Sequence, residues 1–587
     1  MKLQFFKFAF AVLVAALSPT LVFALDFTVD GMYFKVINDD EVAIANYYGT
    51  VEYVGDIVIP ETVVYEGETY RVTAIADNAF SGQNSLTSVN TGHSVKSIGK
   101  YAFDACESLS SIYLGSAVEQ IHEMAIMNCN QLLSIRVHPD NPFFDSREDC
   151  NAIIETASNT LVRACMGSSI PASVTAIGTC GFAALNMKEI EIPASVVSIG
   201  DNAFRWCDSL ECVTILGPVE KIGEAAFSYS PRLASINLPS TVKSIGREAF
   251  QYCRSLTSIH IPDQVTVIEE RMLDGCSSLT EVILGDQVTT ICDFALQLCT
   301  SLAHITLPSS LQSIGLDAFA GDSKLTDVVL PNSLEILGRS AFYGCNLRSV
   351  VIPKSVTSIG TDAIAYNRYL SSIVVEEGNQ VYDSRDNCNA VIETANNRLI
   401  ASCMYTVIPN TVTTIGYNGF AHCMGLTSVT IPESVKTIEE YAFRNCSYLN
   451  TVVIPKSVTF IGKGAFDSCR RLNSTTCKSK TPPTTGSSPF SADALLGKLY
   501  VPRSAVELYK AHEEWGKFPT ILPMPDGGTG DADGDGEVKI SDVVYLIDML
   551  LKGDVDINES PFADVNGDGK ASIRDITAII NIMLSNH

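Results

Sequence analysis

Two acidic segments near the C-terminus carry the residue types and spacing of a metal site. DADGDGEVKISD begins at Asp531 and DVNGDGKASIRD at Asp564. Each has Asp or Asn at its first, third and fifth positions, Gly at the sixth and Asp at the twelfth. The alternate side-chain oxygens can converge on one ion, the glycine permits a sharp turn, and the seventh-position carbonyl adds a ligand. Because such hard oxygen donors suit Ca²⁺, the sequence predicts two calcium sites.

Each loop is expected to supply five ligands. The first set is Asp531, Asp533, Asp535, Asp542 and the carbonyl of Glu537; the second is Asp564, Asn566, Asp568, Asp575 and the carbonyl of Lys570. One acidic segment alone would be interpreted as a solvated tail, but two in register favour a folded module. A helix should follow each loop, with the apolar faces Val544, Ile547, Leu550 and Leu551 in the first and Ile576, Ile579, Ile580 and Met583 in the second.

Asp at the twelfth position, with no helix before the first loop, resembles dockerin modules more than calmodulin-type EF-hands. This resemblance implies calcium binding and a cohesin-like or envelope partner, since dockerins assemble multi-protein complexes, often for polysaccharide degradation. The partner contacts would be Ile540, Ser541, Ile573 and Arg574. These residues depart from the Ser-Thr pair of clostridial dockerins, so the calcium chemistry carries over better than the cohesin partner. The sequence leaves open whether calcium serves docking or only folding.

Most of the preceding chain repeats one unit, exemplified by LASINLPSTVKSIGREAFQYCRS at Leu233–Ser255. The position of Phe250, which we call the marker position, recurs fifteen times, and twelve of the fourteen intervals are 22 or 23 residues. The markers are Phe80, Phe103, Ile126, Phe182, Phe204, Phe227, Phe250, Leu273, Leu296, Phe319, Phe342, Ile364, Phe420, Phe443 and Phe466. One turn cannot bury so wide an apolar face, whereas stacked turns can, so this period predicts a solenoid.

Within the unit, LASINL and VKSIG are expected to be short strands, and REAFQYC a tight helical turn. The arrangement LxxIxIPxxVxxIGxxAFxxC, as in Ser355–Gly360 and Ile454–Val458, resembles the leucine-rich repeats of BspA-like (Treponema pallidum type) bacterial surface antigens. We therefore expect a mostly β leucine-rich repeat solenoid of about 15–17 turns of 22–23 residues, capped at both ends, with a small all-α dockerin-like calcium module.

Two longer intervals contain a shared insertion, near 140–170 and 378–408, which we expect to form a β-hairpin in each case. If the first turn centres on Ala157 and Ser158, the cysteine pairs Cys150–Cys165 and Cys388–Cys403 lie opposite each other, as candidate disulfides or as further core thiols. Ten other cysteines lie three residues after a marker and are predicted to be unpaired core thiols: Cys106, Cys129, Cys207, Cys253, Cys276, Cys299, Cys345, Cys423, Cys446 and Cys469.

One residue per turn should point outward from the longer strand. This stripe is polar and mixed in the first half of the chain and mostly aliphatic in the second, where the candidate ligand face is Ile283, Val329, Val351 and Val374. An exposed apolar stripe is typical of a partner site. The alternative, which we slightly favour, is that β-branched residues simply suit strands.

The N-terminus is typical of a secretory signal peptide, with Lys2 and Lys7 before the apolar Phe8–Leu17 and small residues before Leu25. An uncleaved anchor is disfavoured by the short apolar run. The expected organisation is a signal peptide over 1–24, a β cap over 25–70, repeats over 71–475, a C-terminal cap over 476–522, a linker over 523–530 and the dockerin-like module over 531–587. We expect a secreted or extracellular bacterial protein at the cell surface, with no membrane span after cleavage.

A formal net charge of −26 argues against a nucleic-acid partner. The sequence holds no nucleophile elbow, zinc-protease motif or phosphate loop, so we expect no enzyme, and a hydrolase with an unrecognised site is the least favoured hypothesis. The resemblances imply a secreted or surface adhesion protein whose repeats bind a protein or glycan and whose tail docks through calcium. The alternative is a non-catalytic scaffold or targeting component of a cohesin–dockerin polysaccharide-degrading complex.

Overall fold

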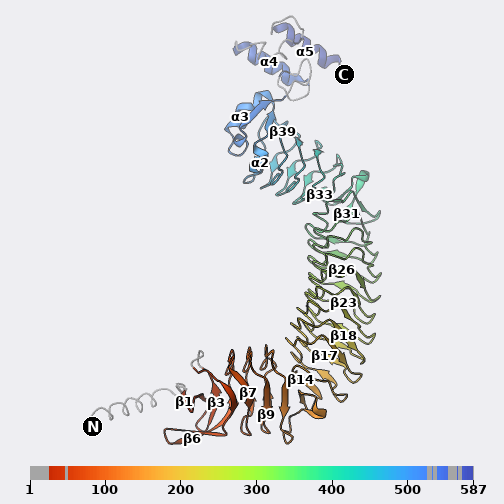
Figure 1. Ribbon diagram of the computed structural model, residues 1–587. Helices are drawn as coiled ribbons and strands as arrows, with labels where there is room; N and C mark the ends of the chain where they lie inside the picture. The colour runs from red at the N-terminus through yellow and green to blue at the C-terminus, as the bar shows by residue number, and fades with distance from the viewer. Residues whose placement is uncertain are drawn as a thin grey trace, which may run out of the picture. The chain divides into compact units, whose positions relative to one another are not determined.

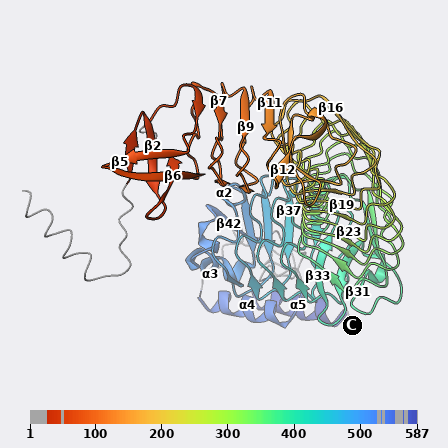
Figure 2. The same ribbon diagram turned by 90° about the horizontal axis from the view of Figure 1, so that it is seen from below.

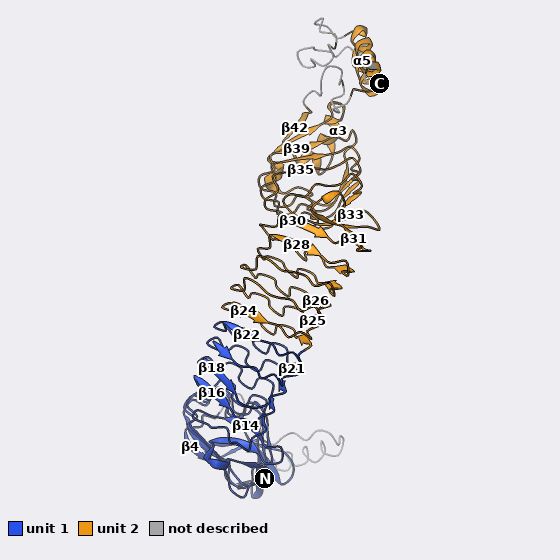
Figure 3. Cartoon of the chain, turned by 90° about the vertical axis from the view of Figure 1, so that its right-hand side faces the viewer, with its two compact units in different colours: residues 1–265 blue, residues 266–587 orange. Residues whose placement is uncertain are grey.

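The computed structural model describes residues 26–46, 51–524, 532, 538–552, 565 and 572–585. It is a mostly β solenoid of about 20 turns, with helices at its C-terminal end (Figure 1). The chain divides into two compact units, residues 1–265 and 266–587 (Figure 3), and each is described by itself. The predicted signal peptide, residues 1–24, lies outside the described residues.

The first unit begins with a cap of longer strands. Their bounds are β1 (Phe27–Val29), β2 (Met32–Val36), β3 (Glu41–Ala45), β4 (Gly55–Val58), β5 (Thr62–Tyr65) and β6 (Glu68–Ile75). β1, β2 and β3 pair antiparallel, whereas β3 pairs parallel with β6 and so starts the parallel ladder of the repeats. Phe27, Phe34 and Tyr53 are buried in this cap and cover the first repeat turn.

Two rows of short parallel strands follow, one strand of each row per turn. The row whose strands are mostly longer is called the longer row, and the other is called the shorter row. The longer row is β7 (Leu86–Asn90), β9 (Ser111–Leu114), β11 (Ser134–Val137), β16 (Glu189–Ile192), β18 (Cys212–Ile215), β20 (Ser235–Ile236) and β22 (Ser258–His260). The shorter row is β8 (Ser97–Ile98), β10 (Gln120–Ile121), β15 (Ala176–Ile177), β17 (Ser198–Ile199), β19 (Lys221–Ile222) and β21 (Ser244–Ile245). β7, β9 and β11 lie side by side in one parallel sheet (Figure 2).

The second unit repeats this plan. Its longer row is β24 (Glu281–Ile283), β28 (Ser349–Ile352), β30 (Ser372–Val375), β35 (Ser428–Thr430) and β37 (Thr451–Ile454). Its shorter row is β23 (Val267–Ile268), β25 (Thr290–Ile291), β26 (Ser313–Ile314), β27 (Ile336–Leu337), β29 (Ser358–Ile359), β34 (Thr414–Ile415), β36 (Thr437–Ile438) and β38 (Phe460–Ile461).

The second unit ends in a cap that continues the stack. Its strands are β39 (Ser474–Cys477), β40 (Thr484–Thr485), β41 (Lys498–Val501) and β42 (Thr520–Pro523), and its helices are α2 (Ala492–Leu495), η3 (Arg503–Ala505), α3 (Val506–Ala511) and η4 (Trp515–Lys517). Phe490 stacks on the last marker, Phe466, at a ring-centroid distance of 5.1 Å, and Trp515 covers Phe490 at 5.2 Å. The apolar column is thereby closed against water.

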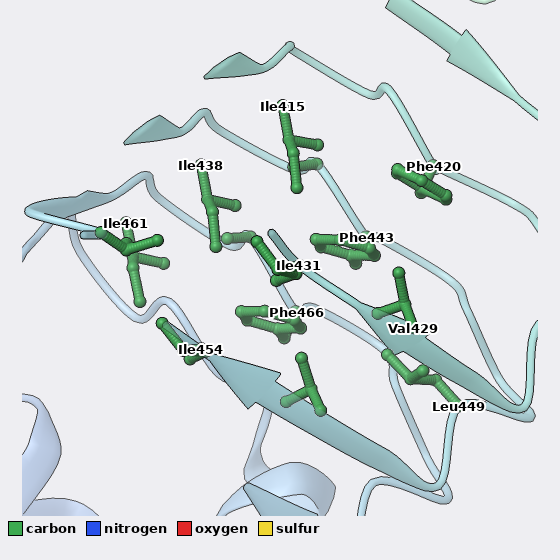
Figure 4. Packing of buried hydrophobic residues seen from close by; sticks show 14 of the residues in the cluster. Ile415, Phe420, Val429, Ile431, Ile438, Phe443, Leu449, Ile454, Ile461 and Phe466 are labelled. Atoms are coloured by element: carbon green, nitrogen blue, oxygen red, sulfur yellow. The ribbon is translucent and has the colours of Figure 1, made fainter. Parts of the chain in front are cut away.

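The marker residues form the core of the stack. All fifteen are buried, and neighbouring phenylalanine rings stack with centroids 4.9 to 5.5 Å apart. Phe420, Phe443 and Phe466 form such a column, beside a second column of Ile415, Ile438 and Ile461 from the shorter strands (Figure 4). The backbone N–H of Phe443 also donates to the carbonyl of Ala465 in the next turn, at 2.7 Å. Each turn is therefore held by its neighbour through both side chains and backbone.

The segment expected to be a tight helical turn is instead a pair of non-helical turns. In the unit around Phe250, Glu248 and Tyr252 have left-handed φ values of 56° and 57°. The left-handed residues turn N–H groups and carbonyls toward the neighbouring turns, where they pair, so the helix prediction was wrong because these contacts outweigh local helix propensity.

The predicted ladder of thiols is confirmed, since none of the eighteen cysteines, all of which lie among the described residues, forms a disulfide. The thiol of Cys253 donates to the carbonyl of Phe227 at 3.2 Å, and that of Cys446 to Phe420 at 3.0 Å. Burial raises the pKa of the Cys253 thiol to about 12, which keeps it protonated as a donor. In the turn of the marker Phe227 a serine stands at the cysteine position, and the hydroxyl of this Ser230 donates to the carbonyl of Phe204.

Asp322 occupies this thiol position in one turn. Both of its carboxyl oxygens are buried without a hydrogen-bond partner. Burial raises the pKa of Asp322 well above its ordinary value, because the charged form loses its hydration. The native state therefore holds a proton that the unfolded chain releases at lower pH.

The two insertions form the expected hairpins. The first comprises β12 (Phe144–Asp145), η1 (Arg147–Asp149), β13 (Ala152–Glu155) and β14 (Thr160–Ala164); the second comprises β31 (Tyr382–Asp383), η2 (Arg385–Asn387), β32 (Ala390–Glu393) and β33 (Arg398–Ser402). β14 pairs parallel with β15, and β33 with β34, so each hairpin adds a turn to the stack. These turns and the caps account for the excess over the expected 15–17.

The candidate disulfides are not formed. Cys150, Cys165, Cys388 and Cys403 are buried free thiols. Ile154 does pair with Leu161 as predicted, but the register shifts between Ile153 and Ile154, so Ala152 pairs with Ala164. The shift moves Cys150 out of direct opposition to Cys165, and the second hairpin shifts in the same way.

Truncation of a stacked marker is expected to destabilise the protein. Phe443→Ala should lower the free energy of unfolding by about 3–5 kcal/mol, because the cavity lies between two rings that cannot close on it. Urea denaturation followed by circular dichroism measures this. The exposed Glu433→Ala is the control, and equal losses in the two variants would contradict the stacking argument.

Replacement of Asp322 by cysteine, the residue that forms the thiol ladder, should stabilise the protein to an extent that depends on pH. Because the folded-state pKa is raised, wild-type stability falls as the pH rises from the ordinary aspartate pKa toward the folded-state value. Asp322→Cys removes this loss, so we expect a gain of about 1–3 kcal/mol at neutral pH that shrinks toward acid pH. Urea denaturation at neutral and at acid pH measures the gain, and Asp208→Asn, a substitution of an exposed aspartate, is the control. A gain independent of pH would refute the titration of Asp322.

Candidate functional site

The C-terminal module packs two helices, α4 (Ile540–Lys552) and α5 (Ile573–Ser585). Most of the predicted calcium ligands lie outside the described residues, namely Asp531, Asp533, Asp535, Glu537, Asp564, Asn566, Asp568 and Lys570. The two twelfth-position carboxylates, Asp542 and Asp575, are described and lie in the first turns of the helices, fully buried.

Backbone contacts fix these two carboxylates in equivalent ways. Asp542 accepts a hydrogen bond from the N–H of Lys539 at 2.7 Å, and Asp575 one from the N–H of Ser572 at 2.8 Å. A buried carboxylate is costly unless further positive charge compensates it. Two such groups at the ends of acidic loops fit a bound Ca²⁺, for which they would be closing ligands.

The helix faces differ in part from the prediction. Val543, Leu546 and Ile579 form the buried contact between the helices. Of the face predicted for α4, only Leu550 packs against this core, whereas Val544, Ile547 and Leu551 are exposed. In α5, Ile576, Ile579 and Met583 pack inward as predicted, and Ile580 is exposed. The prediction was wrong because α4 is apolar on two sides, and periodicity alone does not say which side meets α5.

Each helix therefore presents an exposed apolar stripe, which we call the helix stripe. The stripes are Ile540, Val544, Ile547 and Leu551 on α4 and Ile573, Ile580 and Leu584 on α5, with Thr577 completing the second. Both stripes have the spacing i, i+4, i+7 and i+11. The second stripe begins 33 residues after the first (573 − 540 = 33), which is also the offset between the two loops (564 − 531 = 33). The predicted docking contacts Ile540 and Ile573 head the stripes, 71% and 76% exposed. Their neighbours Ser541 and Arg574 flank them, half-buried and exposed.

Three residues of the candidate ligand face lie on the longer strands β24, β28 and β30 of the second unit, and Val329 lies in a segment without assigned strand structure. Ile283, Val329, Val351 and Val374 are all exposed, and Val329 is 83% exposed. Val351 and Val374 are direct partners in the parallel pair β28–β30. The exposed Thr306 lies between the first two members in the sequence. The structure thus confirms that these side chains point outward.

A second row of surface side chains was missed by the sequence analysis. Trp206, Tyr229 and Tyr252 each follow a marker by two residues and occupy the left-handed position of the turn. Tyr229 and Tyr252 lie 5.0 Å apart between ring centroids, and the Arg205 guanidinium lies 4.4 Å from the centre of the Trp206 ring. Large residues rarely adopt this backbone conformation. The phase of these aromatics within the repeat is the signal that would have found them.

The sequence of the repeats matches a known family. Residues 67–147, 166–276, 243–371 and 400–511 match the model of the BspA type leucine-rich repeat region, in six copies. The chain belongs to this family. Residues 529–584 match the dockerin type I domain. Dockerin type I domains generally bind calcium, and the two matched segments together are typical of protein interaction rather than catalysis.

Several solved structures resemble this BspA-type protein. A leucine-rich cell surface protein of Faecalibacterium prausnitzii is 21% identical over 86% of this chain and 95% of its own, with a TM-score of 0.29. A leucine-rich repeat protein of Bacteroides ovatus is 22% identical over 84% and 98%, with a TM-score of 0.31. The T. pallidum leucine-rich repeat protein is 21% identical over 47% and 90%, with a TM-score of 0.19. No curated protein matches the chain significantly. The family membership rests on the repeat sequence.

Loss of either closing carboxylate is expected to remove one calcium site. Asp542→Ala or Asp575→Ala should reduce the stoichiometry of calcium binding by the full-length protein from two to one, because each loop loses the ligand that closes it. Isothermal titration calorimetry measures this. Asp548→Ala, on the exposed side of α4, is the matched control, and two remaining sites in the Asp542 and Asp575 variants would rule out their role.

Proposed function

We propose that this chain is a secreted, non-enzymatic binding protein of the bacterial surface. Its repeats bind a protein or glycan ligand, and its C-terminal module docks to a second protein in a calcium-dependent manner. The supporting observation is the combination, in one chain, of a BspA-type repeat array and a dockerin type I segment. BspA-type and dockerin proteins are typically extracellular or at the surface. Among the described helices, none has the length and apolar character needed to cross a bilayer.

The ligand face supplies the contact surface of the repeats in this proposal. Its four aliphatic side chains are exposed, and an apolar stripe across successive turns of a soluble protein is typical of an interaction site. The parallel pair β28–β30 holds Val351 and Val374 at a fixed spacing, so binding to them costs little backbone ordering. The face spans several turns, which favours an extended protein or glycan over a small molecule.

The helix stripes supply the docking surface of the tail. Leu551 and Leu584, 81% and 70% exposed, lie at the ends of stripes with the same spacing. Because calcium ligands close the loops at the start of both helices, calcium binding would fix the relative positions of the stripes. We therefore assign Ile540, Ser541, Ile573 and Arg574 as docking contacts at the loop ends of this surface.

A second function is favoured by the dockerin match. A cohesin-type partner would place the chain in a polysaccharide-degrading assembly as a non-catalytic scaffold or targeting component. The departure of Ile540 and Ser541 from a Ser-Thr pair bears on which partner would be selected, since an apolar side chain replaces a hydroxyl at the contact. The partner's identity discriminates between the two functions.

One affinity experiment tests both surfaces. The immobilised full-length protein is exposed to secreted and envelope fractions of the source bacterium and to an array of matrix proteins and glycans, in calcium and in EDTA. Partners of the tail should be lost in EDTA and with Leu551→Asp/Leu584→Asp. Partners of the repeats should persist in EDTA and lose about tenfold or more in affinity with Val329→Glu/Val351→Glu, because a charge must then be desolvated on binding.

The matched control is Thr214→Glu, at the same outward strand position in the first unit. An adhesion ligand on the array supports the first function, and capture of a cohesin-bearing protein from the fractions supports the second. Retention of every partner by both double variants would exclude the ligand face and the helix stripes as binding surfaces.

A further inference from the structure

The two hairpins differ at one core position. The hairpin sequences are offset by 238 residues, so Arg163 of the first corresponds to Ala401 of the second (401 − 163 = 238). The strand registers agree: Ile153 pairs with Arg163, and Val391 pairs with Ala401. The same structural position therefore carries a long cation in one copy and a methyl group in the other.

In the first hairpin the arginine fills the space between the hairpin and the next repeat turn. Its side chain is only 3% exposed. One guanidinium nitrogen donates to the carbonyl of Cys180 at 2.7 Å and the other to the carbonyl of Ala183 at 3.0 Å. The turn carbonyls thus form a receptor for a guanidinium group, and Met124 packs against the cluster of Met127, Cys180 and Ala183.

In the second hairpin the corresponding space is a cavity of about 80 Å³, lined by Ala401, Ser402, Asp362 and Asn418 among others. By the same offset, Asn418 replaces Cys180, Ala421 replaces Ala183, and Asp362 replaces Met124. This volume corresponds to roughly five water molecules, enough for the four heavy atoms of a guanidinium group. Thr361 and Tyr417, both exposed, line its mouth.

The polar groups of this cavity suit a cation. The amide nitrogen of Asn418 donates to both carboxyl oxygens of Asp362, at 3.0 and 2.9 Å, while its own amide oxygen is buried without a hydrogen-bond partner. Burial raises the pKa of Asp362 from its ordinary value, whereas the Asn418 amide and the Arg339 and Arg444 guanidinium groups act to lower it.

The arginine that lines the cavity is already engaged. Arg398 donates to Glu439 through two nitrogens, at 3.0 and 2.7 Å, and lies 3.6 Å from Glu393. The charged residues that line the cavity are thus two acidic ones, Asp362 and Glu393, and this one arginine. A weakly hydrated, planar cation with several N–H donors matches this set of acceptors better than an ammonium ion does.

We propose that the cavity beside Ala401 binds the guanidinium group of an arginine side chain supplied by a partner. The bound group donates to the Asp362 carboxylate, to the Asn418 amide oxygen and to the carbonyls that correspond to the receptor of Arg163. The second hairpin is thereby a recognition site for arginine, whereas the first supplies its own arginine and is closed.

Saturation-transfer NMR with the full-length protein tests this proposal. The probe is L-arginine amide, and L-citrulline amide is its neutral isostere. We expect millimolar binding of the arginine probe and at least about tenfold weaker binding of the citrulline probe, since the charge-assisted bonds are lost. A Gly-Gly-Arg-Gly-Gly peptide should bind if the natural source is a protein side chain, whereas binding of the free amide alone would indicate a small guanidinium compound.

Two variants make the test specific. Ala401→Arg should abolish binding by reproducing the first hairpin, and Asp362→Asn should weaken it about tenfold while retaining the shape of the cavity. Arg163→Ala, which opens the first hairpin beside Met124, should leave the affinity of the Asp362 cavity unchanged. Equal binding of the arginine and citrulline probes, or unchanged binding in both Ala401→Arg and Asp362→Asn, would overturn the proposal.

Discussion

The folded structure of this protein depends on the packing of each turn against the next. A unit of 22 or 23 residues cannot bury its marker residue, so each marker is covered by the marker of the following turn, as Phe420 is by Phe443 and Phe443 by Phe466. The backbones approach so closely that a Cβ on Gly246 would lie 2.6 Å from the backbone nitrogen of Glu224. Ring stacking, side-chain packing and turn-to-turn hydrogen bonds thus form together wherever two turns meet. The stability of the protein therefore comes from contacts between neighbouring turns rather than from one central core.

The thiol position, three residues after the marker, shows what this stacking requires. Cys253, Cys446 and Ser230 differ in polarity, but each is small and donates to a carbonyl of the preceding turn. The requirement is for a compact donor, which explains why so many turns carry a cysteine thiol at this position. Asp322 occupies the same position, but both of its carboxyl oxygens lack a hydrogen-bond partner and burial raises its pKa, so it links the stability of its turn to pH.

Duplication supplies the functional surfaces. The two loop–helix segments of the tail have diverged little, and both keep an exposed apolar stripe that no neighbour within the described module covers. The two hairpins have diverged at the position of Arg163 and Ala401, so one copy is closed by its own cation and the other retains a cavity with acidic surroundings. In both cases a rigid scaffold was copied, and its surface side chains carry the difference in function.

The sequence by itself determined the repeat, the marker column, the thiol ladder and the spacing of the two acidic loops. These follow from periodicity, because a residue that recurs at the same phase meets the same neighbours in every turn. Periodicity does not predict a contact that depends on how one particular pair of strands or helices is aligned. Only the tertiary structure decided that the strand register shifts at Ile153, which separates Cys150 from Cys165. It also decided that Val543 rather than Val544 meets the second helix, and that the space of Arg163 reappears beside Ala401. Each of these depends on where two elements touch, and that is set by packing between segments distant in sequence rather than by the pattern within either one.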